Sequence, residues 1–223
     1  MASETRRSAW PASALTAALV ISGLWLMAGP HPALGEDGRL KVVMLGDSLT
    51  QGGRWSDYFP ECKVANLGIG GDTTIMMLRR LDRVIAAEPR AVFIQGGIND
   101  FASKIRPEAM LKNHEVMWDR LRSRLPLAEL QVISLLPVAE DKFPGWNRRI
   151  REINQALKAR AEAEGLVFID LYALLADETG QLKPEVTFDG LHLTAAGYEI
   201  WSAALRPQLR ALAGNGRSTP GAD

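Results

Sequence analysis

Hydrophobic residues along this chain occur in two patterns that alternate from residue 40 onward. Short runs of branched residues, bounded by glycine or polar residues, are typical of strands that are buried on both faces. Longer stretches with a hydrophobic residue at every third or fourth position are typical of amphipathic helices. The expected strands cover residues 40–45, 63–66, 91–95, 131–136 and 166–170, and the expected helices cover residues 73–87, 107–125, 146–164 and 195–212.

Alternation of strands and helices predicts βαβ units around a parallel sheet. The expected fold class is therefore α/β, with a single doubly wound, flavodoxin-like sheet of five parallel strands flanked by helices. Ligands of such sheets bind beyond the carboxyl ends of the strands. The residues that follow each expected strand are therefore the first candidates for a functional site.

The first 35 residues differ in kind from the rest of the chain. Arg6 and Arg7 precede an uncharged, largely apolar stretch over residues 8–30, and Ala33 and Gly35 supply small residues near its end. This pattern predicts a signal peptide that is cleaved before Glu36, and therefore a periplasmic or extracellular protein. An uncleaved membrane anchor is the alternative, since about 20 apolar residues can span a bilayer.

The expected domain covers residues 36–213, and residues 214–223 form an expected flexible tail because they carry no apolar anchor.

Composition excludes several classes of protein. The chain has 26 basic and 26 acidic residues, which argues against a nucleic-acid surface. A single cysteine, Cys62, excludes an internal disulfide and favours a small buried side chain. Only His114 and His192 follow the leader, and His114 falls within a helical pattern, so no metal site and no cofactor are expected.

Glycine and polar residues cluster after three expected strands and before the last expected helix. The segments are Gly46-Asp47-Ser48-Leu49-Thr50, then residues 66–72, then Gly96-Gly97-Ile98-Asn99-Asp100, and finally Asp189-Gly190-Leu191-His192. Because the carboxyl ends of parallel strands meet at one edge of the sheet, these segments are expected to lie close together.

The clustered residue types are those that acyl transfer by a serine requires. Ser48 is the candidate nucleophile, His192 the candidate base and Asp189 the carboxylate that orients the imidazole. The backbone N–H groups of Ser48 and Gly71 and the side-chain amide of Asn99 are candidate donors to an oxyanion.

Each segment also has a structural interpretation. A serine after Gly-Asp often serves in a turn or helix cap, and glycines often only build turns. Asp72 is expected to cap the helix that follows it. A competing functional hypothesis is a non-catalytic, flavodoxin-like binding module in which residues 68–71 receive a phosphate. That segment matches neither the dinucleotide fingerprint nor the Walker pattern.

The four segments resemble the conserved blocks of the SGNH hydrolases, the GDSL esterase and lipase family. The resemblance spans about residues 40–205, and four blocks in the family order are far more specific than any one of them. Residues 66–73 together with Leu191-His192-Leu193-Thr194 are particularly similar to the catalytic subunits of the platelet-activating factor acetylhydrolases. The resemblance implies a carboxylic ester hydrolase, and the similarity to the acetylhydrolases favours short acyl groups.

The resemblance places Ser48, Gly71, Asn99 and His192 on the four defining residues of the family, and Asp189 on the triad carboxylate. Gly70 is adjacent to Gly71 and is the alternative donor. One departure is Gln51-Gly52-Gly53, where many relatives have a small residue and one glycine.

The expected substrate is a small ester, such as an acetylated carbohydrate, because the chain has few aromatic residues and no long apolar lid. A lysophospholipid or a thioester is the alternative substrate. Seven aromatic residues are candidates for an acyl pocket, although the core is an equally common place for them: Trp55, Tyr58, Phe59, Phe101, Phe143, Trp146 and Phe188.

Overall fold

The computed structural model describes residues 34–215, which contain a sheet of five parallel strands in the order β2-β1-β3-β4-β5. This is the strand order of flavodoxin-like folds, so the predicted fold class is confirmed. The predicted leader lies outside the described residues except for its last two, as do residues 216–223 of the predicted tail. The strands are β1 (Leu40–Gly46), β2 (Cys62–Gly68), β3 (Ala91–Ile94), β4 (Glu129–Ile133) and β5 (Val167–Ile169).

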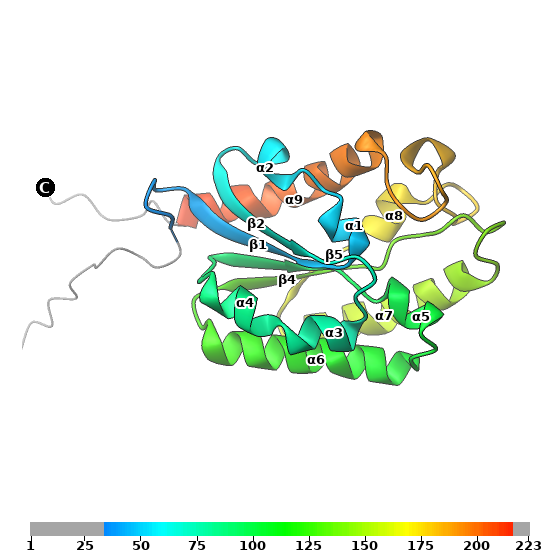
Figure 1. The fold of residues 1–223 in the computed structure, drawn as a ribbon, viewed down its shortest axis with the longest axis horizontal. Coiled ribbons are helices and arrows are strands. Elements are labelled where there is room, and N and C mark those ends of the chain that lie inside the picture. Colours follow the sequence, from blue (N-terminus) through cyan, green and yellow to red (C-terminus); the bar gives the residue numbers. More distant parts are fainter. Residues whose placement is uncertain (1–33, 216–223) are drawn as a thin grey trace, which may run out of the picture.

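Helices cover both faces of the sheet, which gives three layers (Figure 1). One face carries α3, α4, α6 and α7, and the other carries α2, α8 and α9. The helices are α1 (Ser48–Gln51), α2 (Trp55–Tyr58), α3 (Thr74–Arg79), α4 (Leu81–Ala86), α5 (Ile98–Ala102), α6 (Pro107–Arg124), α7 (Trp146–Ala163), α8 (Leu171–Leu175) and α9 (Ala195–Asn215), with one 3₁₀ helix, η1 (Pro184–Val186).

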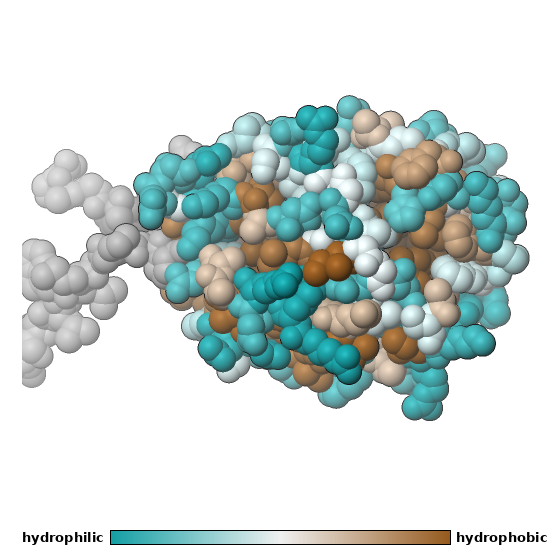
Figure 2. Space-filling view, in the orientation of Figure 1, coloured by the Kyte–Doolittle hydropathy of each residue, from teal (hydrophilic) through white to brown (hydrophobic). Residues whose placement is uncertain are grey.

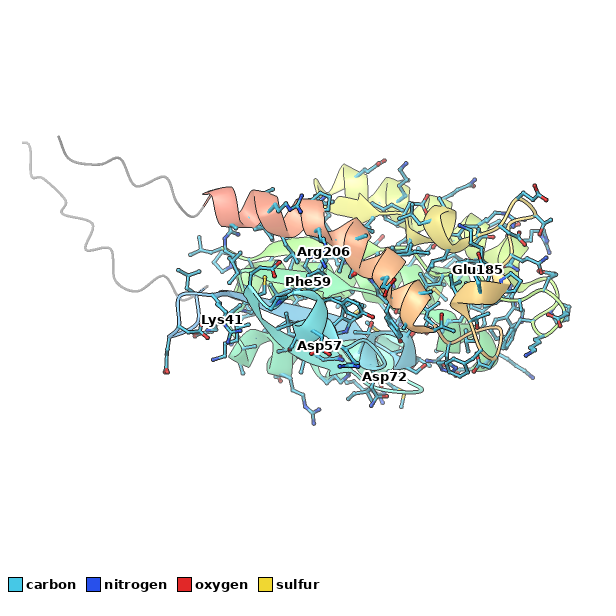
Figure 3. The ribbon with its side chains drawn as sticks, turned by 90° about the horizontal axis from the view of Figure 1, so that it is seen from above. Lys41, Asp57, Phe59, Asp72, Glu185 and Arg206 are labelled. Carbon is cyan, nitrogen blue, oxygen red and sulfur yellow. The ribbon has the colours of Figure 1, made fainter. Side chains whose placement is uncertain are left out.

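The core lies on both sides of the central strands. All four residues of β3 are buried, as are the last five of β1, whereas the edge strand β2 keeps several exposed or half-buried residues. Burial on both faces explains the continuous apolar runs of these strands. On the α9 side, the ring of Trp55 packs against Trp201, and Arg206 lies over Phe59 (Figure 3).

The expected helix over residues 73–87 is two helices, α3 and α4, separated at Arg80. The side chain of Arg80 turns into the end of the sheet, where it binds the carboxylate of Asp72. The prediction that Asp72 caps this helix was therefore wrong, and Thr73 occupies the cap position without a side-chain hydrogen bond. The last helix continues to Asn215, so the first two residues of the predicted tail are helical.

The surface in the orientation of Figure 1 is largely hydrophilic with separate apolar patches (Figure 2). Within residues 34–215, no helix combines the length and the apolar character needed to cross a bilayer.

Candidate active site

Ser48 follows the carboxyl end of the central strand β1 and begins the single-turn helix α1. Asp47 caps this helix, and its carboxylate accepts the N–H of Leu49 at 2.9 Å. The cap turns the chain sharply at the edge of the sheet, and the half-buried Ser48 points toward the segment before α9. There its Oγ lies 3.0 Å from Nε2 of His192.

His192 is held by Asp189, three residues before it. Nδ1 of the ring lies 2.6 Å from Oδ2 of Asp189, while Oδ1 accepts the backbone N–H groups of Leu191 and His192 at 2.9 and 2.7 Å. The carboxylate thus orients both the ring and the loop that carries it. With Nδ1 protonated toward Asp189, Nε2 presents its lone pair to the hydroxyl of Ser48.

Asp189 is ionised over the whole range in which the protein would work. Partial burial opposes its charge, but the hydrogen bonds from the ring and backbone of His192 and from Leu191 outweigh it and lower the pKa to about 2. The ammonium of Lys142 donates a hydrogen bond to the backbone carbonyl of Asp189 at 3.0 Å. A permanent carboxylate stabilises a positive imidazolium on His192.

The loop after β2 brings Gly70 and Gly71 to the same edge. The N–H of Gly70 donates to the side-chain oxygen of Gln51 at 2.9 Å. Within residues 34–215, by contrast, no acceptor takes the N–H of Gly71. Gly71 has a φ of +80°, a conformation that glycine adopts without strain. The hydrogen bonding therefore favours Gly71 over Gly70 as a donor to a ligand.

Asn99 lies in α5, directly after β3, and is half-buried. Its Nδ2 donates to the carbonyl of Asp72 at 3.0 Å, which joins it to the loop of Gly71. The next residue, Asp100, is buried and accepts the N–H and the hydroxyl of Thr74 at 2.9 and 2.6 Å. These bonds fix the strand end of β3 against the start of α3.

Two buried titratable groups contact segments that follow the central strands: Asp47 follows β1, and His114 bonds to Gly96 after β3. Burial raises the pKa of Asp47 to about 7, although the N–H of Leu49 and the nearby His192 act in the opposite direction. Burial also lowers the pKa of His114 to about 4, although its hydrogen bond to the carbonyl of Gly96 opposes this shift. His114 is therefore neutral and lies in the core.

The departure at Gln51-Gly52-Gly53 has a local steric reason. A Cβ at Gly52 would collide with the hydroxyl of Tyr198, and a Cβ at Gly53 would collide with the ring of Trp55. Tyr198 uses that hydroxyl to donate to the carbonyl of Leu49 at 2.8 Å. The two glycines thus allow α9 and α2 to approach α1 closely.

The aromatic candidates for an acyl pocket fall into three groups: Trp55, Phe59 and Phe101 are buried, Tyr58, Phe143 and Trp146 are half-buried, and Phe188 is exposed. Trp55 and Phe59 are 2 % and 0 % exposed and belong to the core, so they do not line an open pocket. Phe188, in contrast, is 70 % exposed, and its ring stacks on that of His192 with the centroids 6.0 Å apart. Phe188 is thus an exposed, large apolar side chain beside the candidate base.

Sequence reasoning missed the roles of Asp47, Gln51 and Arg80 in building this site. Gln51 was noted only as a departure, and nothing in the sequence shows that its side chain reaches Gly70. Arg80 carried a signal: it falls on the helical face of the buried residues Met77 and Val84, where a charged residue needs a partner.

Comparisons with known proteins identify the family of this chain. The sequence profile of the GDSL-like lipase/acylhydrolase family matches residues 44–200. The platelet-activating factor acetylhydrolase IB subunit alpha2 of Homo sapiens is 28 % identical over 170 residues, which are 73 % of each chain.

Two solved structures share the fold and part of the sequence. A GDSL-like lipase from Bacteroides thetaiotaomicron is 26 % identical with a TM-score of 0.70, over 77 % of this chain and 88 % of that one. The lipase/acylhydrolase from Enterococcus faecalis is 27 % identical with a TM-score of 0.67, over 79 % and 96 %. The chain belongs to the GDSL-like lipase/acylhydrolase family and is a carboxylic ester hydrolase.

Proposed function

We propose that the protein is a serine esterase that removes short acyl groups, such as O-acetyl groups, through an acyl-enzyme on Ser48. The observation that carries this proposal is the continuous hydrogen-bonded chain from Ser48 Oγ through His192 to Asp189. This chain lies at the carboxyl edge of the sheet, where ligands of doubly wound folds bind.

In the first half of the reaction, Ser48 attacks the carbonyl carbon of the ester while Nε2 of His192 takes the hydroxyl proton. The N–H groups of Ser48 and Gly71 and the amide of Asn99 bind the oxyanion that forms. His192 then gives its proton to the departing alcohol.

In the second half, His192 removes a proton from water, which attacks the acyl group on Ser48. Collapse of this second intermediate releases the acid and returns the proton to the serine.

The preference for short acyl groups rests on two observations. A Cβ at Gly70 would stand 3.8 Å from Cβ of Ser48, so the glycine loop lies against the nucleophile. Two of the seven aromatic candidates for an acyl pocket, Trp55 and Phe59, are enclosed in the core and offer no surface to a long chain. The similarity to an acetylhydrolase supports the same preference.

The test is hydrolysis of p-nitrophenyl esters from acetyl to palmitoyl by the purified protein and its Ser48→Ala variant. We expect the highest kcat/KM at acetyl or butyryl and no turnover by Ser48→Ala. The matched control is Ser56→Ala, because Ser56 is an exposed serine in α2.

A maximum at long chains would contradict the short-acyl preference but leave the serine mechanism standing. Full activity of Ser48→Ala would overturn the mechanism itself.

A further inference from the structure

Arg80 makes hydrogen bonds unlike those of its neighbours on the same segment. It separates α3 from α4, and its side chain is only 12 % exposed, whereas Arg79 and Arg83 are exposed to solvent. A buried guanidinium is costly unless its donors are paired. Here all three nitrogens of the group find acceptors.

The three acceptors belong to three different segments. Nε of Arg80 donates to the carboxylate of Asp72 at 2.5 Å, one terminal nitrogen donates to the carbonyl of Leu67 at 2.6 Å, and the other to the carbonyl of Gly46 at 2.8 Å. Gly46 ends β1, Leu67 lies near the end of β2, and Asp72 lies in the loop beyond it. Figure 3 labels Asp72 beside these strand ends.

Two of these three segments carry a group of the proposed site. Gly46 precedes Ser48 by two residues, and Asp72 directly follows Gly71. The carbonyl of Asp72 also accepts the side-chain amide of Asn99. One guanidinium is therefore bonded to the strand end just before the nucleophile and to the loop that carries Gly71 and accepts the amide of Asn99. An Arg fork is suited to this task because its donors are held in a fixed plane.

We propose that Arg80 is a positioning residue that sets the donors on Gly71 and Asn99 at their catalytic distance from Ser48. It acts through Gly46 and Asp72 and touches no reacting atom. This inference rests on the proposed function of Ser48, Gly71 and Asn99.

The first test is the Arg80→Lys variant, with Arg79→Lys as the matched control. A lysine keeps the positive charge beside Asp72, but its single ammonium lacks the planar fork that serves three acceptors. We expect kcat for p-nitrophenyl acetate, per serine titrated by a fluorophosphonate, to fall about 10- to 100-fold, since small misplacements of reacting groups cost this much. KM should change little, and Arg79→Lys should match the wild type.

A double-mutant cycle with Asn99→Ala separates positioning from a general loss of structure. If Arg80 acts through the oxyanion donors, Arg80→Lys should lower kcat much less in the Asn99→Ala background than in the wild type. Effects that multiply independently would overturn the proposal, as would an unchanged kcat.

A readout independent of catalysis distinguishes this proposal from the proposed function. In the Arg80→Lys protein, the NMR resonances of the Gly71 amide and the Asn99 side-chain amide should shift, and those of residues on α7 should not. If the two resonances stay in place, the positioning role is wrong whatever the activity. Failure of the proposed function shows separately, as hydrolysis by Ser48→Ala. Should Arg80→Lys not fold, Asp72→Asn serves as the second variant, because it keeps an acceptor but removes the charge that holds Arg80.

Discussion

Burial and hydrogen bonding shift the pKa values of two carboxyl groups at this site in opposite directions: that of Asp189 is lowered and that of Asp47 is raised. Asp189 is partly exposed and accepts three hydrogen bonds, so it stays charged. Asp47 is fully buried, and one of its oxygens has no hydrogen-bond partner among the described residues. Burial without compensation favours the protonated form of a carboxyl group.

The raised pKa of Asp47 predicts a pH-dependent loss of stability. The folded protein holds this proton up to a pKa of about 7, whereas an unfolded chain releases it near the ordinary carboxyl pKa of 3.8. The folded state therefore binds more protons in this window, and the contribution of Asp47 to stability falls as the pH rises from about 4 to 7. His114 contributes with the opposite sign between its folded pKa of about 4 and its ordinary value of 6.5.

The Asp47→Asn variant isolates the contribution of Asp47, because His114 is present in both proteins. Its Tm relative to the wild type should increase steadily from pH 4 to pH 7 and stay constant above pH 7. Thermal unfolding at four pH values across this range measures the difference. A Tm difference independent of pH would show that Asp47 is not protonated in the folded protein.

The strands and helices predicted from the sequence were those long enough to show a repeating pattern of hydrophobic residues. All five strands and the long helices α6, α7 and α9 were found within a few residues of their predicted ends. The single-turn helices α1, α2, α5 and α8 were not predicted, because four or five residues are too few for a helical period to show. The break at Arg80 was also missed, since hydrophobic spacing continues across it and the hydrogen bonds of Arg80 to Gly46, Leu67 and Asp72 cannot be read from that spacing.

The residues of the candidate site were named from the sequence, whereas the contacts that support them were not. Ser48, Gly71, Asn99, Asp189 and His192 form recognisable short patterns, and the structure brings Ser48, Asp189 and His192 into one hydrogen-bonded chain. Contacts such as that of Gln51 with Gly70 depend on how two loops pack, which no local pattern records. The catalytic roles of these residues stay predictions until the serine variant is assayed.

Tyr198 of α9 is predicted to stabilise the packing of α9 on α1. Its hydroxyl is the donor to the buried carbonyl of Leu49, next to the nucleophile. Tyr198→Phe should therefore destabilise the protein by about 1 kcal/mol, through the loss of one buried hydrogen bond. For a chain of this size the Tm should fall by about 2–4 °C.

The matched control for this prediction is Tyr58→Phe. Tyr58 belongs to the same aromatic cluster, and within residues 34–215 its hydroxyl makes no hydrogen bond. Equal Tm values for Tyr198→Phe and Tyr58→Phe would show that the bond to Leu49 does not contribute to stability.

For the whole molecule, we propose export across the membrane, with removal of residues 1–35. The arginine pair, the apolar stretch and the small residues before Glu36 support this proposal. Expression of the full chain in a bacterial host should give a periplasmic or extracellular protein whose N-terminal sequence begins at Glu36. Full-length protein in the membrane fraction would instead favour the anchor. Replacing Leu19 and Leu24 by aspartate is the control, and it should retain the protein in the cytoplasm.

The hydrogen bond between Ser48 and His192 joins residues that are 144 positions apart. One partner follows the first strand, and the other precedes the last helix, so nearly the whole fold must be assembled before the serine meets its base. Hydrolytic activity should therefore report whether both the N-terminal and the C-terminal parts of the domain are present and folded. If Ser48 and His192 act as proposed, products that stop before residue 189 carry the serine without its base. A refolding chain should then regain ester hydrolysis only when its C-terminal segment has docked.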